Sequence, residues 1–131
     1  MWLRPDNLDP ARAEQARATM TAQCRRFAGH PDDDTSLAGQ LWDLDGWSAR
    51  ATELRRAMAP HLGRLAEGDT DALRPGFVLA AAVLRHLAAD PLLPSELLPR
   101  DWPGERLRAD YERFDSTFAA LLRRWLRGDV G

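Results

Sequence analysis

One segment, residues 90–104, limits the possible folds of this chain more than any other. It contains four prolines, four leucines and one tryptophan. Each proline fixes its own φ angle and biases the preceding residue toward an extended conformation, so a continuous helix cannot form there. Connections between helices are ordinarily polar and solvated, whereas these large apolar side chains favour burial. The sequence therefore predicts a rigid, packed connector.

Helices are predicted on both sides of this connector. Residues 77–87 are apolar nearly all round, which predicts a helix at the centre of a bundle rather than on its surface. After the connector, apolar side chains recur at steps of three and four, which predicts a long amphipathic helix. This stripe consists of Leu107, Tyr111, Phe114, Phe118, Leu121, Leu122 and Trp125.

A third helix is predicted before the central one, because apolar residues again step by three and four. Its stripe consists of Leu44, Trp47, Ala51, Leu54, Met58, His61 and Leu65. The predicted fold is therefore mainly α: a C-terminal bundle of three long helices over residues 44–66, 73–89 and 104–127. Short links between them favour antiparallel neighbours.

The first 28 residues show a different pattern, which is typical of a strand, a helix and a second strand. Two strands and a helix without further partners do not form an independent sheet, so this stretch is interpreted as part of an α/β unit. Residues 29–34 are polar and acidic and predict a linker. The predicted domains are thus a partial α/β fragment with its linker (1–34) and a helical domain (35–131).

The overall composition excludes several classes of function. A chain of 131 residues is long enough for one domain with a core and a fragment of a second. Its formal net charge of −2 gives no general attraction to nucleic acid or to an anionic membrane. A single cysteine is typical of a reducing compartment, and no apolar run reaches the roughly 18 residues of a membrane span. A cytoplasmic protein without membrane contact is expected.

The sequence shows no pattern typical of a catalytic or metal site. His30, His61 and His86 lack the spacing of metal ligands on one helix face, and there is no cysteine pair. The acidic run 32–34 lacks the glycine and the later glutamate of a cation-binding loop, so a solvated linker is the better interpretation. No serine lies in a Gly-x-Ser-x-Gly setting. An enzyme is not expected.

The connector and its flanks resemble the C-terminal domain of the PaaX family, bacterial repressors of phenylacetic acid catabolism. The resemblance depends on an arginine-bearing apolar helix followed by a spaced Pro/Trp/Gly pattern, and on Trp42 upstream. It covers roughly residues 40–127, and residues 2–8 resemble the last part of the family's ferredoxin-like middle domain. The motif residues are Asp90, Pro91, Pro94, Leu97, Pro99, Trp102, Pro103 and Gly104.

The resemblance implies a repressor that contacts DNA through an N-terminal winged helix. This chain starts within the middle domain, so the winged helix is expected to be absent, through either truncation or a start codon placed too far downstream. The implied function is the effector-sensing and dimerisation part of such a repressor. The implied partners are a second copy or a full-length, DNA-binding chain, and DNA is contacted only through the absent domain. The alternative is a stand-alone helical protein-interaction module with no small-molecule ligand.

The family's effector implies where a ligand would bind. Phenylacetyl-CoA, or another aryl-CoA, requires cationic partners for its phosphates and an apolar slot for its ring, and no further cofactor is implied. The candidate effector-binding residues are Arg85, Arg55 and Arg56. Arginine pairs also form the solvated face of many amphipathic helices, and Arg85 is equally suited to hold the connector near Asp90.

The tryptophans are interpreted as core residues rather than as a cofactor box. Trp42, Trp47, Trp102 and Trp125 each lie on an apolar stripe or in the connector. Trp102 is expected to close one end of the bundle, and replacing it with alanine is then expected to cost about 3 to 5 kcal/mol.

Overall fold

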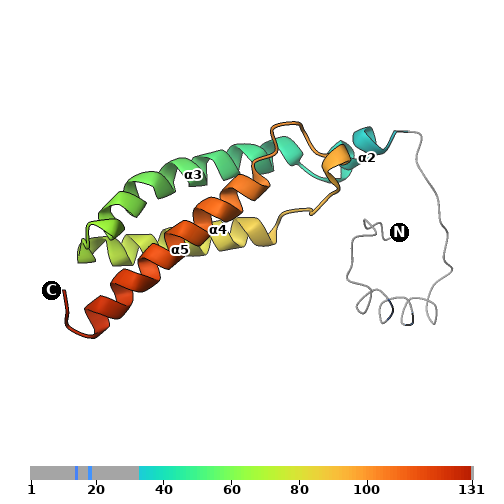
Figure 1. Cartoon of the computed structure of the whole chain (residues 1–131). Coiled ribbons are helices and arrows are strands. Elements are labelled where there is room, and N and C mark those ends of the chain that lie inside the picture. The colour runs from blue at the N-terminus through green and yellow to red at the C-terminus, as the bar shows by residue number, and fades with distance from the viewer. Residues whose placement is uncertain (1–13, 15–17, 19–32, 131) are drawn as a thin grey trace. The chain divides into compact units, whose positions relative to one another are not determined.

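The structure, a computed structural model, describes residues 33–130 together with the helical residues Glu14 and Ala18 (Figure 1). It divides into two compact units, whose described parts are residues 33–42 with 91–98, and residues 43–90 with 99–130. Secondary structure in the described residues is helical, without a strand. Nearly all of the α/β fragment predicted over residues 1–34 lies outside the described residues, so it stays a prediction. None of the described helices is both long enough and apolar enough to span a bilayer.

The second unit is a bundle of three long helices (Figure 1). They are α3 (Leu44–Ala66), α4 (Leu73–Ala88) and α5 (Gly104–Leu126), and each contacts the other two. Helix α4 runs antiparallel to α3, and α5 runs back in the direction of α3. A short 3-10 turn, η1 (Thr70–Ala72), joins α3 to α4. The predicted helices 44–66, 73–89 and 104–127 are thus confirmed to within one residue at each end.

Local sequence signals explain where α3 begins and ends. The Asp43 carboxylate accepts a hydrogen bond of 2.9 Å from the Gly46 amide, which satisfies one of the free N–H groups of the first turn. Gly68 lies at φ 85°, a left-handed conformation that commonly ends helices and that glycine adopts without steric penalty. Asp69 then accepts a 3.0 Å hydrogen bond from the Asp71 amide and starts η1.

The core of the bundle is built mainly from the predicted stripes of α3 and α5, with one residue each from η1 and α4. Its buried members are Trp47, Ala51, Leu54, Met58, Leu65, Ala72, Val83, Leu107, Phe114 and Leu121. The assignment of Trp125 to the core is wrong, because this side chain is 49 % exposed. It lies one turn beyond Leu121, the last buried residue of α5.

Helix α4 is not the central, fully covered helix that its composition predicts. Only Gly76 and Val83 are buried, whereas Phe77, Val78 and Leu84 are 65 %, 64 % and 50 % exposed. In a bundle of three helices each helix has only two neighbours, so the outward side of α4 has no neighbour within the bundle. Its apolar side chains there form an exposed face.

Three stacked rings join the helices at one end of the bundle. The indole of Trp47 lies between the imidazole of His86 and the indole of Trp102, with ring centroids 4.4 and 4.5 Å apart. Trp47 Nε1 donates to the His86 carbonyl at 3.1 Å, and His86 Nε2 donates to the Trp47 carbonyl at 2.9 Å. This confirms Trp102 as a residue that packs on the bundle end, although it remains half-buried.

A charged pair holds the end of α4 to the beginning of α5. The Asp90 side chain is 2 % exposed, and Arg108 of α5 donates a hydrogen bond to its carboxylate. Gly104 lies beside this pair, where a Cβ atom would come 2.6 Å from Trp102 Nε1 and 3.1 Å from Arg108. The alternative role considered for Arg85, holding Asp90, is thus carried out by Arg108.

The connector is packed only in part, which corrects the prediction of a uniformly buried bridge. Its first half contains η2 (Ser95–Leu97), which contacts α2 (Asp34–Leu41) within the first unit. Leu93 is buried and Leu97 half-buried, but Leu92 is 59 % exposed. Leu92 lies at φ 52°, a left-handed conformation that is uncommon outside glycine, so the chain turns at this residue instead of continuing as an extended strand.

The remaining motif residues fall at the ends of these elements. Trp42 is the half-buried C-cap of α2, and its backbone N–H donates to the Ala38 carbonyl at 3.0 Å. Pro103 is the buried N-cap of α5. Pro91 is half-buried, whereas Pro94 and Pro99 are exposed.

A second ion pair crosses from α3 to α5. Arg55 donates to Asp110 at 2.5 Å, and Arg113 donates to the same carboxylate at 2.6 Å. Partial burial acts to raise the pKa of Asp110, but the hydrogen bonds and charges of Arg55 and Arg113 outweigh it, so the pKa lies below the ordinary value of 3.8. The charged form of Asp110 is thus favoured in the folded state.

Replacing Trp102 with alanine is expected to lower the free energy of unfolding by about 3 kcal/mol, the lower end of the range for buried tryptophan, because the ring is only half-buried. Trp125→Ala is the matched control and should cost less than about 1 kcal/mol, since this ring lies outside the core. Urea denaturation of the two variants measures the difference. Equal losses would contradict the assigned role of the stacked rings.

The lowered pKa of Asp110 predicts a contribution to stability that is complete above the unfolded pKa, near 3.8, and is lost as the pH falls through the lower folded value. Asp110→Asn is therefore expected to flatten the decline of the melting temperature below about pH 4. Thermal denaturation from pH 6 to pH 2 measures this slope. An unchanged acid limb in the variant would contradict the assignment.

Candidate functional site

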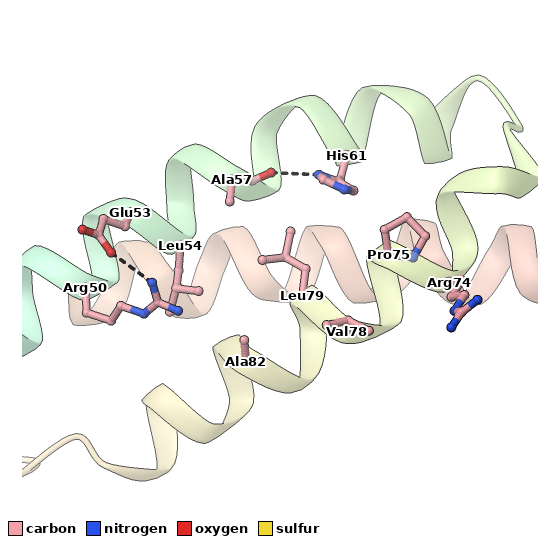
Figure 2. A pocket seen from close by; sticks show the side chains of 10 residues that line it. All are labelled: Arg50, Glu53, Leu54, Ala57, His61, Arg74, Pro75, Val78, Leu79 and Ala82. Carbon is pink, nitrogen blue, oxygen red and sulfur yellow. Dashed lines mark hydrogen bonds and ion pairs between the residues drawn. The ribbon is translucent and has the colours of Figure 1, made fainter.

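An open groove runs between α3 and α4 and is the candidate ligand site (Figure 2). Its volume is about 510 Å³, within the range of about 300–1,000 Å³ that small-molecule sites occupy. The residues that line it are Arg50, Glu53, Leu54, Ala57, His61, Arg74, Pro75, Val78, Leu79 and Ala82.

Helical spacing places these side chains on facing sides of two antiparallel helices. On α3, Arg50, Leu54, Ala57 and His61 recur at steps of three and four, and on α4 the same steps bring lining residues to the groove. Leu54 is buried and forms part of its apolar lining. The groove therefore has an apolar interior with cationic and polar groups along its rim.

The charges at the rim are not equally available to a ligand. Arg50 is bound to Glu53 at 3.0 Å, so these two charges largely neutralise each other. His61 donates its Nδ1 hydrogen to the Ala57 carbonyl at 3.1 Å (Figure 2), which leaves Nε2 as the other polar atom of the ring. Arg74 is exposed and forms no ion pair within the described residues. An anionic group bound here would thus meet Arg74 first.

The arginines predicted from the sequence lie elsewhere. Arg55 faces α5, where it is bound to Asp110, and none of Arg55, Arg56 and Arg85 lines the groove. Arg56 and Arg85 are exposed on α3 and α4. Their role in effector binding stays a prediction.

Neither Arg74 as a ligand-site residue nor the groove position of His61 was predicted from the sequence. The available signal was the spacing of Arg74, Val78 and Ala82 at four-residue steps on α4. This spacing shows that the three residues share one side of α4, but it does not show that this side borders α3.

The other predicted ligand candidates do not form a metal centre within the described part of the chain. His61 lies in the groove, and His86 is bound to Trp47 in the core. No group of three or more His, Cys, Asp or Glu side chains with metal-binding geometry occurs among residues 33–130. His30 and Asp32 lie outside the described residues. Asp33 is the N-cap of α2, accepting a 2.9 Å hydrogen bond from the Ser36 amide.

Comparisons with known proteins place this arrangement among PaaX-like proteins. The family described as PaaX-like protein C-terminal domain matches residues 42–128. A solved structure, the uncharacterized protein Rv0674 from Mycobacterium tuberculosis, is similar with 41 % sequence identity and a TM-score of 0.65 over 92 % of this chain. This chain spans 46 % of that protein, about half its length. No curated protein matches.

The family match covers well over half of the chain, including all three bundle helices, the Trp102 stack and the Asp90–Arg108 pair. The chain therefore belongs to the PaaX-like family, whose C-terminal domain it contains.

Proposed function

We propose that this chain is the effector-sensing and dimerisation part of a PaaX-like transcriptional repressor of aromatic acid catabolism, with phenylacetyl-CoA or another aryl-CoA as effector. The observation that carries the proposal is the groove between α3 and α4, found within the region that matches the PaaX-like C-terminal domain. We assign no catalytic reaction to it.

The chemistry of the groove suits an anionic thioester with an apolar end. Leu54, Leu79 and Ala82 offer apolar contacts for an aromatic ring, and Arg74 at the rim offers a cation for a phosphate. Arginine binds phosphate oxygens with two parallel hydrogen bonds, which gives both affinity and orientation.

Effector binding would act by changing how the helices pack. The groove is lined by both α3 and α4, so a ligand seated there contacts two elements whose relative position it can bias. In the proposed repressor this signal reaches a DNA-binding part through a second copy or a full-length partner chain in the cytoplasm. With a net charge of −2, these residues are assigned no DNA contact.

Titration calorimetry of the full chain with phenylacetyl-CoA tests the proposal, with CoA and free phenylacetate as controls for the two halves of the ligand. Saturable binding that is stronger than for either control is expected. Arg74→Gln should weaken it about tenfold or more, the usual cost of losing a charged hydrogen bond. The matched controls Arg56→Gln and Arg85→Gln change exposed arginines outside the groove and should bind normally.

Two outcomes would contradict this assignment in different ways. If Arg56→Gln or Arg85→Gln weakens binding and Arg74→Gln does not, the effector site is the one predicted from the sequence, not the groove. If the unaltered chain binds none of the three compounds but associates with itself as its concentration rises, it is a helical interaction module without a ligand.

A further inference from the structure

The outward side of α4 is a surface that the proposed effector site uses only along its edge, at Arg74 and Val78. Phe77, Ala81 and Leu84 recur at steps of four and three and lie along one side of the helix, with Val78 beside them. Phe77 and Val78 are about two-thirds exposed and Leu84 is half exposed. Large apolar side chains gathered on one exposed helix face are typical of a protein–protein contact rather than of a solvated surface.

The charges on this helix have a single sign. Arg74 and Arg85 are exposed and lie on the same side as the apolar residues, one near each end. Helix α4 contains no aspartate or glutamate; Asp71 precedes it in η1. In the adjoining groove Glu53 is already bound to Arg50. The face is thus apolar along its centre and cationic at both ends.

The groove extends this face toward α3. Val78 and Arg74 belong both to the exposed side of α4 and to the groove lining (Figure 2). A helix lying along α4 would therefore have room for a large side chain in the groove while its apolar stripe covers Phe77 and Leu84. This is the arrangement in which amphipathic helices bind to grooves, with anchors at i, i+3, i+4 and i+7.

We infer that the outward face of α4 binds an amphipathic helix of another protein, whose apolar stripe is flanked by acidic residues. Charge complementarity decides between this occupant and a second copy of the same chain. Pairing two copies of a face that carries only arginines brings like charges together, whereas glutamates on a partner neutralise Arg74 and Arg85. The inference does not rest on effector binding, because its apolar centre, Phe77 and Leu84, lies outside the groove; only Arg74 and Val78 are shared with the groove.

The test uses the full chain and two synthetic 18-residue helical peptides, measured by fluorescence anisotropy. Both peptides carry leucines at i, i+3, i+4 and i+7, and they differ only in the flanking residues, which are glutamates in one and lysines in the other. The glutamate peptide is expected to bind about threefold to tenfold more tightly, the range that two partly exposed ion pairs supply.

Matched variants separate the face from the rest of the surface. The double variant Phe77→Ser/Leu84→Ser should fold, because both side chains are exposed, and it should lose binding of the glutamate peptide. Arg74→Glu/Arg85→Glu should reverse the preference toward the lysine peptide. Arg123→Glu/Arg124→Glu changes exposed arginines on α5 and should leave the preference unchanged.

Three outcomes would overturn the inference. The first is equal binding of the two peptides by the unaltered chain. The second is a preference for the glutamate peptide that survives the charge reversal on α4. The third is a dimer in sedimentation experiments that Phe77→Ser/Leu84→Ser converts to a monomer, since the face would then bind a second copy.

Discussion

The buried carboxylate of Asp90 is the group on which the end of this bundle depends. Its side chain is 2 % exposed, and Arg108 binds it from α5. Removing a charge from water costs several kcal/mol unless a partner and hydrogen bonds compensate for it, and Arg108 of α5 supplies such a partner to Asp90. The pair therefore fixes where the chain leaves α4 relative to where α5 begins. Gly104 belongs to the same arrangement, because a side chain there would displace Trp102 or Arg108.

This fixed end has consequences for the candidate site. Trp47 and His86 exchange hydrogen bonds between α3 and α4 close to Asp90, and Trp102 stacks on Trp47. The spacing of α3 and α4, whose facing sides form the groove, is set by these contacts at one end and by η1 at the other. The arginines divide accordingly: Arg55 and Arg108 are bound to buried or half-buried carboxylates, whereas Arg74 and Arg85 remain exposed for recognition.

The helices could be predicted from the sequence because their signals are local. The stripe from Leu44 to Leu65 and the Asp43 cap depend only on spacing along the chain. The exposure of Phe77 and Leu84 could not be predicted, since an apolar helix looks the same whether two or three neighbours cover it. The ion-pair partners of the arginines could not be predicted either. Arg55 lies 55 residues from Asp110 in the chain, and only the packing of α3 on α5 brings the two side chains together.

In the proline-rich connector, local sequence predicts the interruption of the helix but not which side chains are buried. Its prolines correctly exclude a continuous helix, and its motif residues Trp102, Pro103 and Gly104 do pack at the start of α5. The burial of its leucines differs from one position to the next, because the backbone turns at Leu92, which has a left-handed φ of 52°, and again in the 3-10 turn that contains Leu97. Composition predicts burial of the segment as a whole, but not which of its side chains turn inward.

The most direct test of this account is a double-mutant cycle on Asp90 and Arg108, measured by urea denaturation. Arg108→Met is predicted to lower the free energy of unfolding by about 3 kcal/mol, because it removes the cation that hydrogen-bonds to a buried carboxylate. Adding Asp90→Asn should restore part of that loss, since the neutral amide costs less to bury. A loss below about 0.5 kcal/mol for Arg108→Met, or no recovery in the double variant, would contradict the central role of this pair.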